Sequence, residues 1–194
     1  MRKEEVKKWI DDCHKKHKKA AIYFCSFVPV EILEAAGFQT LQITHLEENG
    51  DLYPEELPKN VCPIVRECCE ICESGILEQA DLIIAESSCD GKKKMFEFLG
   101  RIKDVHVMHL PNVQDEFGKQ LWKAEIIRLK DRLEEKFHVQ ISDESVRQAV
   151  RKNNQIRSAL KEFCELMKQE PAPMSGYELF QVLYGSWFKL YSDE

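Results

Sequence analysis

Four short apolar runs, separated by segments of helical character, constrain the fold of this chain most strongly. They read AAIYF at residues 20–24, FQTLQIT at 38–44, DLIIA at 81–85 and DVHVMHL at 104–110. A short run that is apolar on both faces is typical of a central strand in a parallel sheet. Helices are expected at 31–36, 63–79 and 91–102. This alternation predicts an α/β fold, a Rossmann-like parallel four-stranded sheet with flanking helices.

Proline and glycine mark the expected ends of these segments. Pro63 stands where a first-turn proline is tolerated, and Gly37 can adopt the left-handed conformation at a helix end. The polar stretch 45–60, with Pro54 and Pro58, is expected to be a loop.

A helical C-terminal extension is expected after Pro111. One long amphipathic helix is indicated by apolar residues at steps of three and four, namely Trp122, Ile126, Leu129, Leu133 and Phe137. Ser142 is expected to cap a second long helix. The buried face expected for that helix consists of Val146, Val150, Asn153, Ile156, Leu160, Phe163 and Met167. Residues 175–178, SGYE, fit a capping box that opens a last helix.

The chain therefore divides into four expected parts. They are an N-terminal helix (1–19), an α/β domain with the candidate site (20–115), long helices packing on it (116–170), and an apolar helix leading to an absent or partner domain (171–194). Residues 176–190 carry seven large apolar side chains: Leu179, Phe180, Val182, Leu183, Trp187, Phe188 and Leu190. Such a segment predicts association with a second copy, a partner subunit or a downstream domain. The alternative is that the helix folds back onto the first domain.

Composition and charge narrow the class of protein. The 194 residues are 43% hydrophobic and 32% charged, a balance that allows a globular core. No apolar run reaches the roughly 18 residues of a membrane-spanning helix, and the charged N-terminus does not resemble a secretory signal. A cytoplasmic location without membrane contact is expected. The net charge of -6 argues against nucleic acid as the main partner.

Eight cysteines in a chain of this type indicate reduced thiols, metal ligation or redox chemistry. Cys25 ends the first strand, Cys62 precedes the Pro63 helix, and Cys89 follows the third strand. Loops outside the carboxyl ends of parallel strands form the ligand crevice, so these thiols are expected on one rim. Helix N-termini near Cys62 and Cys89 favour thiolates, which an iron–sulfur cluster or zinc ion requires.

Simple packing is the alternative for every cysteine, because free cysteines are among the most buried residues. Cys13 and Cys164 are expected to pack or to lie at the surface. Within the sequence CCEIC, Cys68 and Cys72 share a helical face while Cys69 points elsewhere. A single CxxC pair inside a helix is not a zinc knuckle. Spacing alone leaves Cys25, Cys62 and Cys89 as one possible ligand set among others.

Three cysteine motifs stand in a recognisable order: CSFVPVEILEAAG at 25–37, VCPIVR at 61–66 and SCDGKKKM at 88–95. With Leu110-Pro111, the helix from Trp122 and PAPMSGYE at 171–178, they resemble the 2-hydroxyacyl-CoA dehydratase D-component family. That family also includes benzoyl-CoA reductase subunits and double-cubane cluster proteins. The resemblance covers nearly the whole chain from about residue 20. Family subunits are about twice this length, so the chain resembles the N-terminal half of one.

The resemblance implies an oxygen-sensitive iron–sulfur protein. A 4Fe–4S cluster or a double cubane is held by cysteines, with one iron site open to act as a Lewis acid. An ATP-hydrolysing activator supplies one electron, and water leaves a 2-hydroxyacyl-CoA through a radical. Cys62 and Cys89 match cluster ligands. Cys25 matches a motif position that is Cys or Ser in the family, and Cys25 or a partner chain could complete the ligand set.

Other residues of these motifs have two interpretations each. Ser26, Lys92 and Lys93 are candidate substrate contacts, since the lysine run 92–94 could meet the phosphates of coenzyme A; the alternative is a solvated surface. Asp90 and Gly91 could shape the turn after Cys89. The remaining candidates are Arg66, for cluster charge or a surface ion pair, and Glu31 and His45, for proton transfer or structure.

Three functions therefore stand beside one another. The first is a dehydratase-like lyase or related acyl-CoA reductase component, working with an acyl-CoA, an activator and a second subunit. The second is a non-catalytic electron-transfer or scaffold module that binds a cluster or zinc. The third is a Rossmann-like half-domain with free thiols and no metal.

Overall fold

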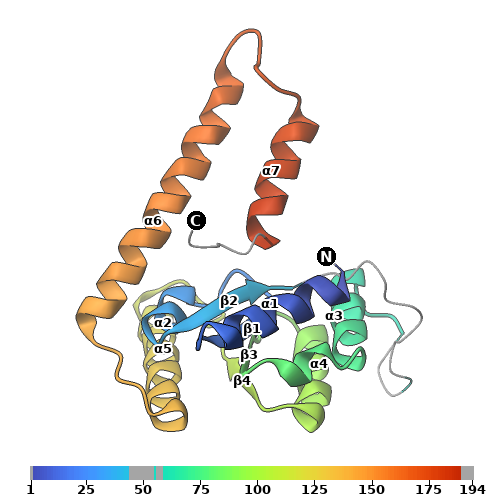
Figure 1. Ribbon diagram of the computed structural model, residues 1–194, viewed down its shortest axis with the longest axis vertical. Coiled ribbons are helices and arrows are strands. Elements are labelled where there is room, and N and C mark those ends of the chain that lie inside the picture. The colour runs from blue at the N-terminus through green and yellow to red at the C-terminus, as the bar shows by residue number, and fades with distance from the viewer. Residues whose placement is uncertain (1, 44–54, 56–58, 189–194) are drawn as a thin grey trace.

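The computed structural model describes residues 2–43, 55 and 59–188, without the side chains of the last two. Its centre is a four-stranded sheet in the order β2-β1-β3-β4, in which every neighbouring pair is parallel (Figure 1). The strands are β1 (Lys19–Tyr23), β2 (Phe38–Gln42), β3 (Leu82–Glu86) and β4 (Val105–Met108). The α/β class with a parallel four-stranded sheet is confirmed.

Seven α-helices surround or extend this sheet in the described part of the chain. They are α1 (Lys3–Lys15), α2 (Val30–Ala35), α3 (Pro63–Glu73), α4 (Asp90–Ile102), α5 (Glu116–Phe137), α6 (Asp143–Glu165) and α7 (Gly176–Phe188). Two short 3₁₀ segments are η1 (Ile76–Gln79) and η2 (Leu166–Lys168).

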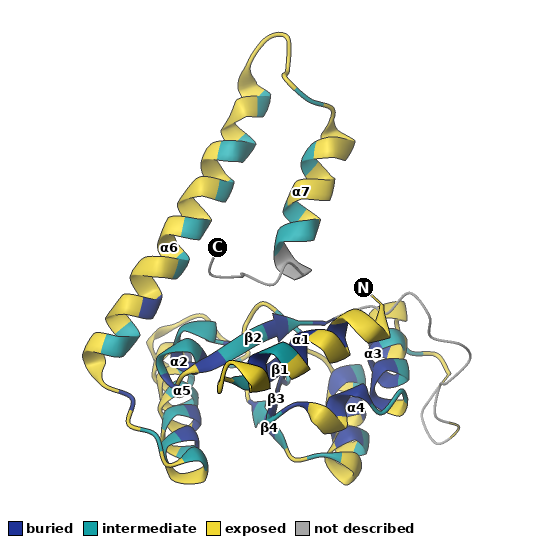
Figure 2. Cartoon of the chain, in the orientation of Figure 1, coloured by how far each residue is buried: buried dark blue, intermediate teal, exposed yellow. Residues whose placement is uncertain are grey.

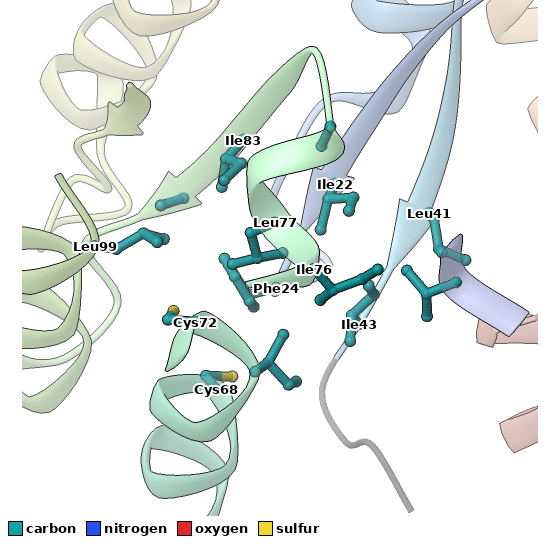
Figure 3. Packing of buried hydrophobic residues seen from close by; sticks show 14 of the residues in the cluster. Ile22, Phe24, Leu41, Ile43, Cys68, Cys72, Ile76, Leu77, Ile83 and Leu99 are labelled. Atoms are coloured by element: carbon teal, nitrogen blue, oxygen red, sulfur yellow. The ribbon is translucent and has the colours of Figure 1, made fainter. Parts of the chain in front are cut away.

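Alternating strand residues feed two apolar clusters, one on each face of the sheet. Ile22 and Ile83 belong to the cluster under α1, α3 and α4, part of which Figure 3 shows. Their neighbours Ala21 and Ile84 belong to the opposite cluster, under α2 and α5. Successive side chains of a strand point to opposite faces, so a sheet covered on both sides needs apolar residues throughout. All five residues of β3 are buried.

The helix expected over 63–79 is shorter in the structure. It ends at Glu73, and Gly75 has a φ of 74° before the 3₁₀ segment η1 begins. Glycine adopts this left-handed conformation without a steric penalty, which is why the helix ends there. Gly37 has a φ of 84° after α2, as expected. His45 and most of the expected 45–60 loop lie outside the described residues.

The two long helices differ in how far they are buried. Leu129 and Leu133 of α5 are buried, and the other three residues of its apolar stripe pack against them: Trp122, Ile126 and Phe137. On α6, none of the seven residues expected on its buried face is buried, so that expectation is wrong. Figure 2 shows the cause, because α6 leaves the body after its first turns. Only Ala149 of α6 is buried.

The starts of the last two helices follow the expected capping patterns. Ser142 Oγ accepts a hydrogen bond from the backbone N–H of Ser145 at 3.1 Å at the start of α6. Before α7, Ser175 Oγ accepts from the N–H of Glu178 at 3.2 Å, and Glu178 Oε2 accepts from the N–H of Ser175 at 2.7 Å. This reciprocal pair is the capping box that the sequence indicates. No helix in the described ranges is long and apolar enough to span a bilayer.

Candidate functional site

The topology opens a crevice between the carboxyl ends of β1 and β3. The chain leaves β1 towards β2 through α2 on one face, whereas β3 is followed by α4 on the other face. In an open parallel sheet, ligands bind where the connections diverge in this way. Cys25 follows β1 and Cys89 follows β3, so both lie at this edge.

Two of the candidate thiols belong to residues that precede a helix. Cys62 is the N-cap of α3 and Cys89 is the N-cap of α4. Both residues are exposed. The Cys89 sulfur accepts a hydrogen bond from the backbone N–H of Lys92 at 3.4 Å. Free N–H groups and the helix dipole favour negative charge at such a position, as thiolate ligation requires.

The first turns of α3 and α4 lie side by side. Val65 Cγ2 of α3 is 3.4 Å from the position that a Cβ on Gly91 would occupy, and the Cys89 sulfur is 3.9 Å from the same point. This contact brings the N-termini that carry Cys62 and Cys89 into one region of the rim.

Lys92 connects the two strand-end cysteines. Its backbone N–H bonds to the Cys89 sulfur, and its side chain interacts with the thiol of Cys25, which is half-buried. The Lys92 ammonium also donates to Glu86 Oε1 at 2.6 Å. Glu86 ends β3 and is fully buried. Cys25 and Cys89 therefore share a neighbour, and a buried charge pair lies beside them.

Four other cysteines are part of the apolar core rather than of the rim. Cys68, Cys69 and Cys72 of α3 and Cys13 of α1 are all buried, and Figure 3 shows two of them in the cluster. Burial raises the pKa of the Cys13 thiol to about 11 and those of Cys68 and Cys69 to about 12. The expectation that Cys69 points away from the others' environment is wrong, since all three pack inside.

The rim thiols are not drawn together around one point. Among residues 2–43, 55 and 59–188, no group of three or more His, Cys, Asp or Glu side chains is placed to hold a single metal ion. Cys25, Cys62 and Cys89 remain a predicted ligand set. Their chemistry suits an iron–sulfur cluster, because three free thiols lie at one sheet edge and two of them cap helices.

A cleft of about 430 Å³ adjoins the same edge at the carboxyl ends of β1 and β2. Ser26 lines it beside Tyr23, Gln42 and Trp122. Glu31 also lines this cleft, where it forms an ion pair with Arg157 of α6.

The remaining candidates of the motifs lie at the surface or inside. Lys93 pairs with Asp90 at 3.1 Å, Lys94 with Glu97 at 2.9 Å and Arg66 with Glu70 at 3.3 Å. Lys92 is only 7% exposed, so Lys93 is the candidate phosphate contact whose ammonium faces water.

Glu86 is the residue of this region that sequence reasoning missed. The expected strand stops at Ala85, whereas β3 includes Glu86. The available signal was a carboxylate directly after four apolar strand residues, at the edge where the ligand crevice was expected. A carboxylate there is buried only if a cation pairs with it.

These features define a class: a parallel α/β protein with thiols gathered at the carboxyl edge of its sheet. The family described as 2-hydroxyglutaryl-CoA dehydratase, D-component, matches residues 25–194. The chain belongs to this family, as the cysteine motifs predict.

Three relatives illustrate the range of the family. The provisionally named dehydratase subunit YjiM of Escherichia coli (strain K12) is 36% identical over 86% of this chain and 45% of its own length. The beta subunit of (R)-2-hydroxyglutaryl-CoA dehydratase from Acidaminococcus fermentans is 26% identical over 89% and 47%. One subunit of the benzoyl-CoA reductase from Thauera aromatica is 25% identical over 86% and 45%. The chain spans less than half the length of each of these relatives.

Proposed function

We propose that this chain is an iron–sulfur component of a 2-hydroxyacyl-CoA dehydratase-type enzyme. The observation that carries the proposal is the placement of Cys25, Cys62 and Cys89 at one sheet edge, in a chain of this family. Two relatives are named for a 2-hydroxyacyl-CoA dehydratase and an acyl-CoA reductase, both of which act on acyl thioesters. The proposed reaction is the elimination of water from a 2-hydroxyacyl-CoA after one-electron reduction.

In this proposal, Cys25, Cys62 and Cys89 hold a 4Fe–4S cluster or a double cubane. When bound, the cluster supplies single-electron transfer and an iron that can polarise a carbonyl oxygen. The N-termini of α3 and α4 offset part of the negative charge of the thiolates. The four buried cysteines keep their protons, because burial raises the pKa of each.

The substrate is proposed to lie between these thiols and the adjoining cleft. Ser26 follows Cys25 directly and lines that cleft, so its hydroxyl can donate a hydrogen bond to an acyl oxygen. Lys93 is proposed to meet a phosphate of coenzyme A at the surface of α4. The partners are proposed to be an ATP-dependent activator and a second subunit, since two of the relatives are themselves named as subunits of acyl-CoA enzymes.

Anaerobic reconstitution with iron and sulfide tests the proposal. The wild-type chain is expected to turn brown and to bind about four irons per cluster, with an electron paramagnetic resonance signal on reduction. Cys62→Ala and Cys89→Ala are expected to lose most of this iron. Cys164→Ala is the matched control, because Cys164 is a half-buried thiol on α6 outside the rim.

Two results would contradict the proposal. A colourless wild-type protein without bound iron would remove its basis. One equivalent of zinc with no iron and no acyl-CoA binding would instead support a non-catalytic scaffold. Equal iron loss in Cys164→Ala and Cys89→Ala would show that the ligands were assigned to the wrong thiols.

A further inference from the structure

A buried ion pair lies directly behind the cysteine rim. Lys92 Nζ donates to Glu86 Oε1 at 2.6 Å, with Glu86 0% and Lys92 7% exposed. The next two lysines of the same run behave differently, because Lys93 and Lys94 pair with carboxylates at the surface. One lysine of three is therefore turned into the protein.

This pair is a poor device for stabilising the fold. Glu86 Oε1 accepts from both Lys92 and Ser88 Oγ, the latter at 2.9 Å. The other oxygen, Oε2, is buried and has no hydrogen-bond partner within the described part of the chain. Burying a charged pair with an unsatisfied oxygen costs free energy that apolar side chains would not cost. A role other than stability is therefore worth seeking.

The position of the ammonium suggests that role. Lys92 interacts with the Cys25 thiol through its side chain and with the Cys89 sulfur through its backbone N–H. Burial alone disfavours the ammonium, but the hydrogen bond and charge of Glu86, with Cys25, outweigh it and raise the pKa of Lys92. The side chain is therefore a fixed positive charge, and it acts in a region where the low dielectric strengthens its field.

We propose that Lys92 is the charge-balancing residue of the cysteine rim and that Glu86 is the residue that positions it. This rests on the proposed function, in which Cys25, Cys62 and Cys89 hold an iron–sulfur cluster. Thiolates and a reduced cluster are negatively charged, and each electron gained adds one negative unit. A fixed ammonium nearby therefore favours the reduced form and raises the reduction potential, which depends on local charge.

The test is the midpoint potential of reconstituted protein, measured by a redox titration followed by electron paramagnetic resonance. Lys92→Met is expected to shift the potential to a more negative value than wild type. Glu86→Gln is expected to shift it to a less negative value, because the ammonium is then no longer offset by a carboxylate. Lys93→Met is the matched control and is expected to keep the wild-type potential, since its exposed charge is screened by water and salt.

Opposite shifts distinguish electrostatics from a merely structural role, which would move both variants in the same direction. If Lys92→Met fails to fold because Glu86 is left unpaired, the double variant Glu86→Gln with Lys92→Met carries the test. Its potential is expected to be more negative than that of Glu86→Gln alone. Lys92→Arg, which keeps the positive charge, is expected to keep a potential close to wild type.

The outcomes separate this proposal from the one on which it rests. Cluster-loaded variants that share the wild-type potential, or that shift in one direction, would overturn the role of Lys92 alone. A wild-type chain that assembles no cluster would overturn the proposed function and the role of Lys92 with it.

Discussion

The α/β body and the α6–α7 arm use apolar residues in opposite ways. In the body, the two clusters on the faces of the sheet bury nearly all their large side chains. In the arm, Ala149 is the one buried residue between 143 and 186, while Tyr177 and Phe180 are 69% and 58% exposed (Figure 2). The rings of Phe180 and Tyr184 stack 5.3 Å apart, yet both remain exposed. The body stabilises itself, whereas the arm presents an apolar surface to something else.

The largest expected difference between the two regions is in the free energy of unfolding. Ile83→Ala, in the centre of β3, removes a fully buried side chain and is expected to cost about 2–5 kcal/mol. Ile156→Ala, half-buried on α6, is expected to cost about 1 kcal/mol or less. Urea denaturation of both variants, with unchanged m-values, measures the difference. Equal losses would show that the arm belongs to the same cooperative core.

The second prediction concerns acid, which is expected to weaken the body. His106 of β4 is fully buried, and burial, with Arg128 and Arg132 nearby, lowers its pKa to about 4. The unfolded chain binds a proton near pH 6.5, so the folded form loses stability as the pH falls from 6.5 to 4. This loss amounts to about 3 kcal/mol. Residues 143–186 contain no histidine, so this effect is confined to the body.

His106→Gln is the variant that checks this effect. Its free energy of unfolding, measured by urea denaturation at several values between pH 7 and pH 4, is expected to fall less steeply than that of wild type. His109→Gln, at an exposed position on the same segment, is the control and is expected to follow the wild-type curve. A His106→Gln curve parallel to wild type would show that His106 is protonated within the fold.

The smallest expected effect concerns association through residues 176–190. Covering a side chain such as Phe contributes roughly 1.5–3 kcal/mol. Phe180→Asp is therefore expected to weaken self-association or binding to a partner subunit while leaving the stability of the body unchanged. Light scattering across a concentration series measures it, with Gln181→Asp on the same helix as control. A monomeric wild type whose stability falls on Phe180→Asp would show that α7 packs on its own body.

Sequence patterns predicted the sheet because its two faces leave a local mark. A strand covered on both sides must be apolar throughout, and AAIYF and DLIIA meet that condition. The order of Cys25, Cys62 and Cys89 relative to those strands then placed them at the carboxyl edge. Helix caps such as Ser142 were also predictable, because a cap involves residues only a few positions apart.

The burial of α6 was not predictable from its pattern. Val150 and Ile156 lie on one apolar stripe, which indicates an apolar partner but not which one. The structure turns α6 away from the sheet, so the stripe is at best half-buried along its length. A helical period reports that a face needs covering and carries no information on what lies opposite.

The sequence by itself determined the strands, the helix ends and the three thiols of the rim, because each depends on residues close together in the chain. Only the tertiary structure decided which lysine of the run 92–94 turns inward. As a sequence, the run is three equivalent cations. Packing of α4 against α3 and β3 places Lys92 alone beside the buried Glu86 and the Cys25 thiol, because a buried carboxylate is tolerated only where a cation meets it.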